Sequence, residues 1–328
     1  MNPLYSWHQT AWQHIQTMLD NQRMPHALII AGVTGLAKAD FAQQLASTML
    51  CLQPNHHQAC GQCHSCQLML AGTHPDHLYI GPEESSKVIK VDQIRQLKDK
   101  QALTPNISQW KTVIIHPADA MNLNASNSLL KLLEEPPANT LIMLVSDSTS
   151  HLPITIRSRC QTLNISSADI EQSRQWLSAH AMSPDEDDLV RLQALTGGAP
   201  LQIKRMIEHG SLESLNQAAR DFDQLIKGQG NIIQLAQDWQ NLDLSLLFQQ
   251  LQRWVSEQIK ATLVSGQHPS SGLQAQQLWR VLDCITATIK LISSQNNFNK
   301  ILLIEDFMVS IVQITSHKTS SQVNLNEQ

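Results

Sequence analysis

The sequence has few aromatic residues, little charge and no excess of basic residues. Aromatic residues make up 4% of the 328 positions and charged residues 16%. The shortage of aromatic rings argues against the base-stacking platforms with which proteins hold single-stranded nucleic acid. A chain that grips DNA by itself usually has a basic surface, whereas this one has a net charge of -5 and a pI of about 6.3. The composition therefore argues against a protein that binds DNA through its own charge.

Long hydrophobic runs are also missing. The sequence contains no uninterrupted apolar run of about 18 residues, which a membrane-spanning helix needs, and no charged-then-apolar leader. We therefore expect a protein without membrane contact that works in the cytoplasm. Hydrophobic residues nevertheless make up 42% of the chain, which is enough for real cores, and the length predicts two or three domains.

The stretch LIIAGVTGLAKAD at 28–40 has the layout of a phosphate-binding loop, with a buried strand, a glycine turn and a helix that opens near the lysine. In such loops glycines let backbone N–H groups face the phosphates, a lysine neutralises them, and a hydroxyl holds Mg²⁺. The glycines and the lysine are present as Gly32, Gly35 and Lys38. Ala37 replaces the glycine before the lysine, and Ala39 replaces the hydroxyl residue after it. The sequence therefore predicts the shape of a nucleotide site without its chemistry.

A second strand, at 113–115, supports the same interpretation. In ATP-hydrolysing P-loop proteins the tip of such a strand carries an acidic residue for Mg²⁺. Here the tip carries His116 and Pro117, and Asp119 lies two residues farther along, where we expect a turn. We therefore expect no magnesium-binding carboxylate at this strand end.

Two adjacent glutamates, Glu134 and Glu135, stand at the end of a predicted helix at 126–137, before two prolines. A pair of carboxylates can serve acid–base catalysis. At a helix end before Pro-Pro, however, we expect a solvated or partner-facing edge.

Four of the six cysteines cluster within residues 51–66, which we call the cysteine knuckle. They are separated by eight, two and two residues: Cys51, Cys60, Cys63 and Cys66. Four such thiolates complete a closed tetrahedral zinc shell with no open position for water, so the spacing predicts a structural Zn²⁺ site. An iron–sulfur cluster, a redox CxxC pair and four packed thiols are the alternatives. Ferredoxin runs place a proline where Gln67 stands.

The remainder of the sequence has helical patterning. Segments 168–180 and 184–196 begin with polar or acidic residues, as is typical of helix N-termini. Beyond residue 208 no strand-like alternation occurs, and long amphipathic segments follow, with Trp254 and Trp279 at positions expected in a core. The predicted fold class is therefore α/β followed by all-α.

Taken in order, four motifs resemble those of bacterial clamp-loader subunits of the AAA+ class. They are GVTGLAK at 32–38, CxxCxxC at 60–66, SNSLLKLLEEPP at 126–137 and PITIRSRC at 153–160. The succession of Leu-Glu-Glu-Pro-Pro and, about twenty residues later, Ser-Arg-Cys is the specific part. The resemblance is dense over the first half of the chain, weaker to about residue 207 and only architectural beyond.

The resemblance implies a division into three domains. Residues 1–165 would form an AAA+ P-loop domain with a parallel sheet and the zinc knuckle. Residues 166–207 would form a small helical lid, and residues 208–328 a helical collar bundle that holds subunits in a ring.

The family's site residues match this sequence position by position. The four cysteines of the knuckle match its zinc ligands. Arg159, flanked by Ser158 and Cys160, matches an arginine finger that acts in trans on the ATP of a neighbouring motor subunit. Lys38 matches the loop lysine, but the departures described above, together with Leu201 in place of a sensor arginine, imply that no ATP is bound or hydrolysed in cis.

The resemblance thus implies a non-hydrolysing, stator-like subunit of the clamp loader of DNA polymerase III, a DNA-directed DNA polymerase. Its partners would be the motor subunits (gamma/tau) and the delta subunit. Through the complex it would also meet the sliding clamp and primed DNA.

Two alternatives stay open on the sequence alone. The chain could be an active clamp-loader ATPase of the same fold, which would bind and turn over Mg·ATP by itself. It could also be a zinc-dependent nucleic-acid-binding adaptor, although its acidic balance argues against that function.

Overall fold

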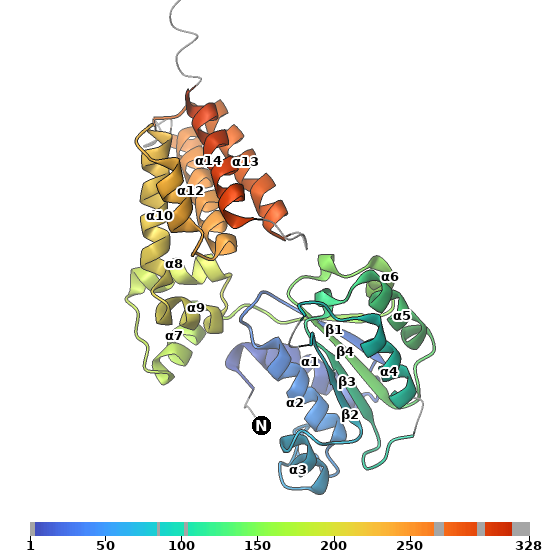
Figure 1. The fold of residues 1–328 in the computed structure, drawn as a ribbon. Coiled ribbons are helices and arrows are strands. Elements are labelled where there is room, and N and C mark those ends of the chain that lie inside the picture. Colours follow the sequence, from blue (N-terminus) through green and yellow to red (C-terminus); the bar gives the residue numbers. More distant parts are fainter. Residues whose placement is uncertain (1–3, 84–85, 102–103, 266–271, 294–298, 317–328) are drawn as a thin grey trace, which may run out of the picture. The chain divides into compact units, whose positions relative to one another are not determined.

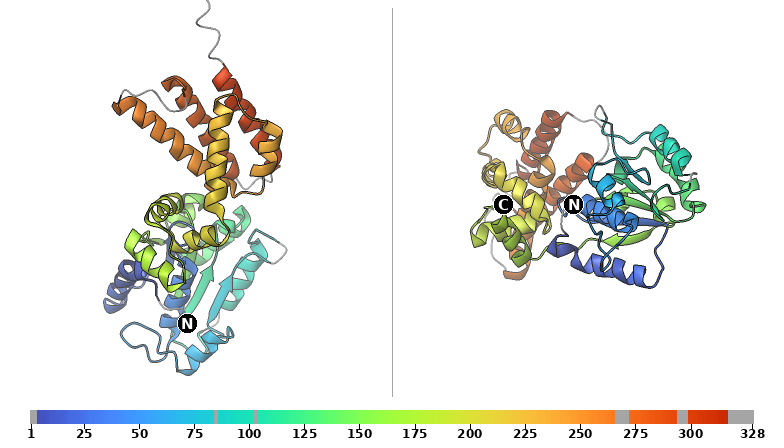
Figure 2. Two further views of the ribbon diagram at one scale, coloured as in Figure 1. Left: turned by 90° about the vertical axis from the view of Figure 1, so that its left-hand side faces the viewer. Right: turned by 90° about the horizontal axis from the view of Figure 1, so that it is seen from below.

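The computed structural model describes residues 4–83, 86–101, 104–265, 272–293 and 299–316. The chain divides into two compact units, Met1–Ile203 and Lys204–Gln328. The first unit contains a parallel sheet with helices, and the described part of the second contains helices only (Figure 1 and Figure 2). The predicted class, α/β followed by all-α, is confirmed, whereas the separate lid at 166–207 stays a prediction.

The sheet of the first unit has five parallel strands in the order β2-β3-β4-β1-β5. Their bounds are Ala27–Ala31 (β1), His77–Ile80 (β2), Lys111–Ile115 (β3), Thr140–Ser146 (β4) and Gln161–Asn164 (β5). Every residue of β1, β3 and β4 is buried, as expected for inner strands covered on both faces. Because the strands are parallel, their carboxyl ends meet at one edge, where open α/β sheets bind ligands.

Helices cover both faces of this sheet (Figure 1). The bounds of the helices around it are Gln9–Asp20 (α1), Lys38–Leu50 (α2), His64–Leu70 (α3), Val91–Gln101 (α4), Leu123–Glu134 (α5) and Ile154–Arg157 (α6). Helix α5 begins earlier than the predicted 126–137, because the Asn122 side chain accepts a hydrogen bond from the Ala125 N–H and caps it.

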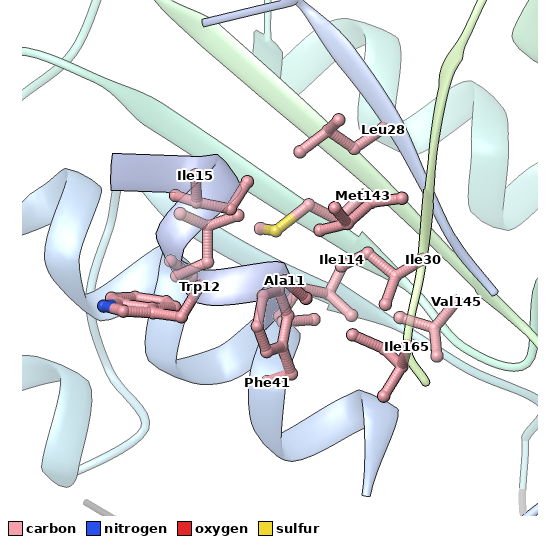
Figure 3. Packing of buried hydrophobic residues seen from close by; sticks show 14 of the residues in the cluster. Ala11, Trp12, Ile15, Leu28, Ile30, Phe41, Ile114, Met143, Val145 and Ile165 are labelled. Atoms are coloured by element: carbon pink, nitrogen blue, oxygen red, sulfur yellow. The ribbon is translucent and has the colours of Figure 1, made fainter. Parts of the chain in front are cut away.

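The alternation of side chains along β1 separates two hydrophobic cores. Leu28 and Ile30 belong to the cluster that contains Phe41 of α2, shown in Figure 3. Ile29 and Ala31 point to the opposite face and pack in the cluster formed with α4 and α5. Successive residues of a strand face opposite sides, so a short run of apolar residues fills both layers.

Helices alone make up the rest of the described chain. Their bounds are Ile170–Ala179 (α7), Glu186–Thr196 (α8), Pro200–Glu208 (α9), Ser211–Ile226 (α10), Ile232–Trp239 (α11), Leu244–Ser265 (α12), Ala275–Ser293 (α13) and Lys300–Ser316 (α14). In the second unit Phe307 is central to the core, with its ring 4.7 Å from that of Phe248 and 6.0 Å from that of Phe222. Among the described helices, we find none whose length and hydropathy would let it span a bilayer.

The prediction that Trp254 and Trp279 occupy core positions is wrong for Trp279, which is 49% exposed. The buried column of α13 contains Leu278, Val281, Ile285 and Thr288, so Trp279 falls on the adjacent face of the helix. Trp254 is half-buried, with its ring 5.9 Å from that of Phe222.

We expect Phe41→Ala to destabilise the first unit by about 3–5 kcal/mol, because the fully buried ring leaves a cavity between α1 and α2. Leu123→Ala is the control, since Leu123 is 68% exposed and should change stability by less than about 0.5 kcal/mol. Native-state hydrogen exchange of the β1 amides in the full-length chain measures the free energy of opening. Equal protection in the two variants would contradict this role of the ring.

Candidate functional site

The loop between β1 and α2 lies at the carboxyl edge of the sheet. Strand β1 ends at Ala31 and α2 begins at Lys38, as the phosphate-loop pattern predicts. Gly35 has a φ of +92°, and a Cβ there would lie 2.8 Å from the backbone nitrogen of Gln202. Ala37 adopts the left-handed conformation (φ 56°), which costs a non-glycine residue about 1–2 kcal/mol. The loop thus keeps a glycine-type backbone although one glycine has been replaced.

The predicted loop lysine is paired inside the protein. Lys38 Nζ donates to Asp147 Oδ1 at 2.6 Å and to the Val33 carbonyl oxygen at 2.9 Å. The Thr34 hydroxyl donates to the other carboxylate oxygen, Oδ2, at 2.6 Å. Burial would raise the pKa of Asp147, but the hydrogen bonds from Lys38 and Thr34 hold that pKa below its ordinary value. Asp147 is therefore ionised at neutral pH and neutralises the lysine.

Sequence patterning did not identify Asp147 as a residue of the site. It follows directly after the seven-residue buried strand β4, and β4 pairs with β1. A polar residue at the carboxyl end of a buried strand is a signal that could have identified it, because such ends meet at the ligand-binding edge.

The tip of β3 carries His116 and Pro117, as predicted. The His116 Nδ1 lies 3.0 Å from the Tyr79 hydroxyl oxygen, and burial lowers the pKa of His116 below its ordinary value. Asp119 lies on the short 3-10 turn Ala118–Ala120, where its Oδ1 accepts a hydrogen bond from the Ser146 hydroxyl at 3.1 Å. The strand end therefore presents a neutral imidazole, while the nearest acid of this segment is bound to β4.

Arg159 follows α6 and precedes β5. Its guanidinium donates to Glu134 Oε1 at 2.7 Å and to the Thr155 carbonyl oxygen at 3.0 Å. The side chains of Arg159 and Glu134 are 36% and 48% exposed. Glu134 thus forms an accessible edge, as expected, but also pairs with Arg159, which sequence patterning did not indicate. The neighbouring Cys160 is packed against the core, and burial raises the pKa of its thiol to about 12.

Arg159 and the loop lie at opposite edges of the sheet. Strand β5 runs parallel to β1, with Gln161 beside Leu28 and Asn164 beside Ala31. Arg159 precedes the first residue of β5, whereas the loop follows the last residue of β1. At about 3.3 Å per residue, these paired strand segments alone are about 10 Å long.

The structure brings the four predicted cysteines of the knuckle together. Their sulfur atoms all lie within 4.8 Å of one another, with Cys51 Sγ 3.9 Å from Cys63 Sγ and Cys60 Sγ 4.0 Å from Cys66 Sγ. A tetrahedral Zn²⁺ with bonds of about 2.3 Å would separate its sulfur ligands by about 3.8 Å. The donor set therefore fits a zinc ion in number, kind and spacing.

Backbone N–H groups converge on these sulfurs. The N–H of Cys60 donates to Cys51 Sγ and the N–H of Cys63 to Cys60 Sγ, each at 3.3 Å. Burial would raise the pKa of Cys63, but backbone N–H groups of Cys66 and Leu52 lower it to about 6. Such N–H donors favour the thiolate form that a metal requires, whereas burial raises the pKa of the Cys51 and Cys66 thiols.

A network of buried polar side chains links the knuckle to the end of α2 and to the segment before β2. The hydroxyls of Ser65 and Ser108 both donate to the Leu50 carbonyl oxygen, each at 2.7 Å. The His74 Nε2 lies 2.9 Å from Ser65 Oγ, and its Nδ1 accepts the Asp76 N–H at 3.0 Å. These contacts fasten both ends of the knuckle, and no local pattern in the sequence indicated them.

Comparison with known proteins identifies the family. The family model described as "DNA polymerase III, delta subunit" matches residues 7–169. DNA polymerase III subunit delta' of Pseudomonas aeruginosa is 32% identical over 326 residues, which cover 99% of this chain and 94% of that protein. The corresponding subunit of Haemophilus influenzae is 33% identical over 222 residues, which cover 68% of this chain and 67% of that protein.

The similarity extends to a second kind of subunit. DNA polymerase III subunit tau/gamma of Haemophilus influenzae is 30% identical over 196 residues, which cover 57% of this chain and 28% of that protein. The match over almost the whole length, however, is with the delta' subunit. The motifs and the full-length similarity agree, and the chain belongs to the delta' subunits of the DNA polymerase III clamp loader.

Proposed function

We propose that this chain is the non-hydrolysing, stator-like subunit of the clamp loader and that Arg159 acts in trans on the ATP of a neighbouring motor subunit. The observation that carries the proposal is the position of Arg159 at the edge of the sheet opposite the chain's own loop. A side chain at that edge cannot serve a phosphate at the other, whereas its 36% exposure leaves it accessible to a partner.

The residues at the loop do not fit Mg·ATP. Lys38 is already neutralised by Asp147, so its charge is not available to a phosphate. Ala39 has no hydroxyl for Mg²⁺, and burial keeps His116 neutral where hydrolysing relatives of this fold place an acid. These substitutions support a subunit without its own ATPase activity.

The ion pair between Arg159 and Glu134 is weak enough for Arg159 to leave it and bind the ATP of a neighbouring subunit. Exposed ion pairs contribute about 0–1 kcal/mol, so leaving Glu134 costs little. A γ-phosphate offers more negative charge and a geometry that a guanidinium can bind through two N–H groups. In other phosphoryl-transfer systems an arginine finger contributes about 10³–10⁵ in rate. We therefore propose that Glu134 holds Arg159 in the free subunit and releases it to the neighbour's ATP.

The wider assembly follows from the family. We propose that the chain works in the cytoplasm with gamma/tau motor subunits and the delta subunit, and reaches the sliding clamp and primed DNA through the complex. In this proposal residues 166–207 form the lid and residues 208–328 the collar.

We also propose that the knuckle holds a structural Zn²⁺. The four cysteines would fill all four positions of a tetrahedral shell, which would leave none for a reacting water. The ion would cross-link the end of α2, the following loop and α3.

Arg159→Ala should lower the ATPase rate of a complex reconstituted with motor subunits, delta subunit, clamp and primed DNA by about tenfold or more, while assembly persists. The measurement is clamp-stimulated ATP turnover, with subunit content checked by size-exclusion chromatography. Arg157→Ala is the matched control, because Arg157 is an exposed arginine two residues away. An undiminished rate with Arg159→Ala would rule out the finger, and Mg·ATP turnover by the isolated chain would rule out the stator.

The purified chain should contain one zinc ion, which Cys60→Ala and Cys63→Ala should each release. Element analysis by mass spectrometry measures the metal content. Cys284→Ala is the control, because that cysteine lies on α13, outside the knuckle. Iron together with visible absorption would instead identify an iron–sulfur cluster, and metal-free folded protein would identify packed thiols.

A further inference from the structure

We infer that the Asp147 carboxylate occupies the anion-binding place of the loop and excludes phosphate groups as an intramolecular competitor. The loop would then be a preserved phosphate site closed by the protein's own anion, rather than a site that has lost its affinity. This inference does not depend on the role of Arg159 in trans.

The two side chains of the loop that can donate to an anion both bind this carboxylate. Lys38 Nζ and Thr34 Oγ1 each approach one of its oxygens at 2.6 Å. These are short, charge-assisted contacts of the kind that a phosphate group would make. The carboxylate thus uses the donors that a bound phosphate would need.

The exposures of the two partners show how the site is closed. The Lys38 side chain is 5% exposed, whereas that of Asp147 is 45% exposed. The carboxylate therefore lies toward the solvent and covers a buried ammonium group. An external anion that pairs with Lys38 would therefore have to replace Asp147 as its partner.

The loop backbone is held in place by contacts that do not involve Asp147. The Leu36 carbonyl oxygen accepts hydrogen bonds from Trp7 Nε1 at 3.1 Å and, with that nitrogen protonated, from His8 Nε2 at 2.7 Å. The Gly35 carbonyl oxygen accepts the N–H of Leu201 at 3.2 Å. Removal of the carboxylate should therefore leave the loop formed and its lysine without a charged partner.

An unpaired buried charge is unfavourable, so the vacated place should attract a new anion. A ligand that binds only the folded state stabilises it by an amount that grows with its concentration. We therefore expect that removal of the Asp147 carboxylate increases the affinity of the protein for phosphate. We also expect phosphate to stabilise the folded variant.

The experiment compares the full-length wild type with Asp147→Ala by calorimetric titration of inorganic phosphate, tripolyphosphate and ATP without Mg²⁺. We expect Asp147→Ala to bind phosphate or polyphosphate about tenfold or more tightly than the wild type, and its thermal midpoint to rise with phosphate. Asp147→Asn keeps the shape of the side chain without its charge and should show the same change if the alanine variant fails to fold. Parallel titrations distinguish free phosphate from the phosphates of a nucleotide, and a gain with either supports the inference.

Two controls test whether any gain in phosphate affinity depends on the Lys38 ammonium group. The double variant Lys38→Ala/Asp147→Ala should lose it, because the ammonium group is gone. Asp92→Ala removes an equally charged but 74% exposed carboxylate on α4 and should not change phosphate binding. Folded Asp147 variants that bind phosphate no better than the wild type, or a gain that survives the loss of Lys38, would overturn the inference.

Discussion

The parallel direction of the five strands is the constraint on which the functional arrangement of the first unit depends. Parallel strands bring all their carboxyl ends to one edge of the sheet, and there the loop after β1, the histidine after β3 and the aspartate after β4 meet. The same direction puts the residues before β5 at the opposite edge, where Arg159 pairs with Glu134. The first unit therefore presents the loop at one edge of its sheet and Arg159 at the other.

The loop between β1 and α2 keeps the backbone of a phosphate-binding loop although two of its expected residues are replaced. Ala37 retains the left-handed conformation, and α2 still begins at Lys38. A buried ammonium group is costly without an anion, and in this chain the carboxylate of Asp147 supplies one. With the charge satisfied internally, the loop joins α2 to the sheet as a structural element.

The cysteine knuckle is a segment of the first unit with little hydrophobic packing. Residues 51–63 contribute few buried side chains, so this segment has little hydrophobic core of its own. Its sulfur atoms converge through backbone N–H groups. The Ser65 hydroxyl ties the knuckle to the Leu50 carbonyl oxygen at the end of α2, which also accepts a hydrogen bond from the Ser108 hydroxyl. The proposed metal ion would cross-link this segment where hydrophobic packing is sparse. The knuckle thus adds a local, polar means of stabilisation to a unit otherwise held by two hydrophobic layers.

The sequence by itself determined the features that are encoded locally. The strand at 28–31, the helix beginning at Lys38, the four cysteines and the Ser-Arg-Cys segment each depend on residues close together in the chain, so spacing and residue type were enough to find them. Only the tertiary structure decided which charges meet. Lys38 and Asp147 are 109 residues apart, and Arg159 and Glu134 are 25 apart. These pairings depend on the order of the strands and on the helices between them, which no local pattern specifies. The same reason explains Trp279, because the face of a helix that becomes buried is fixed by what packs against it.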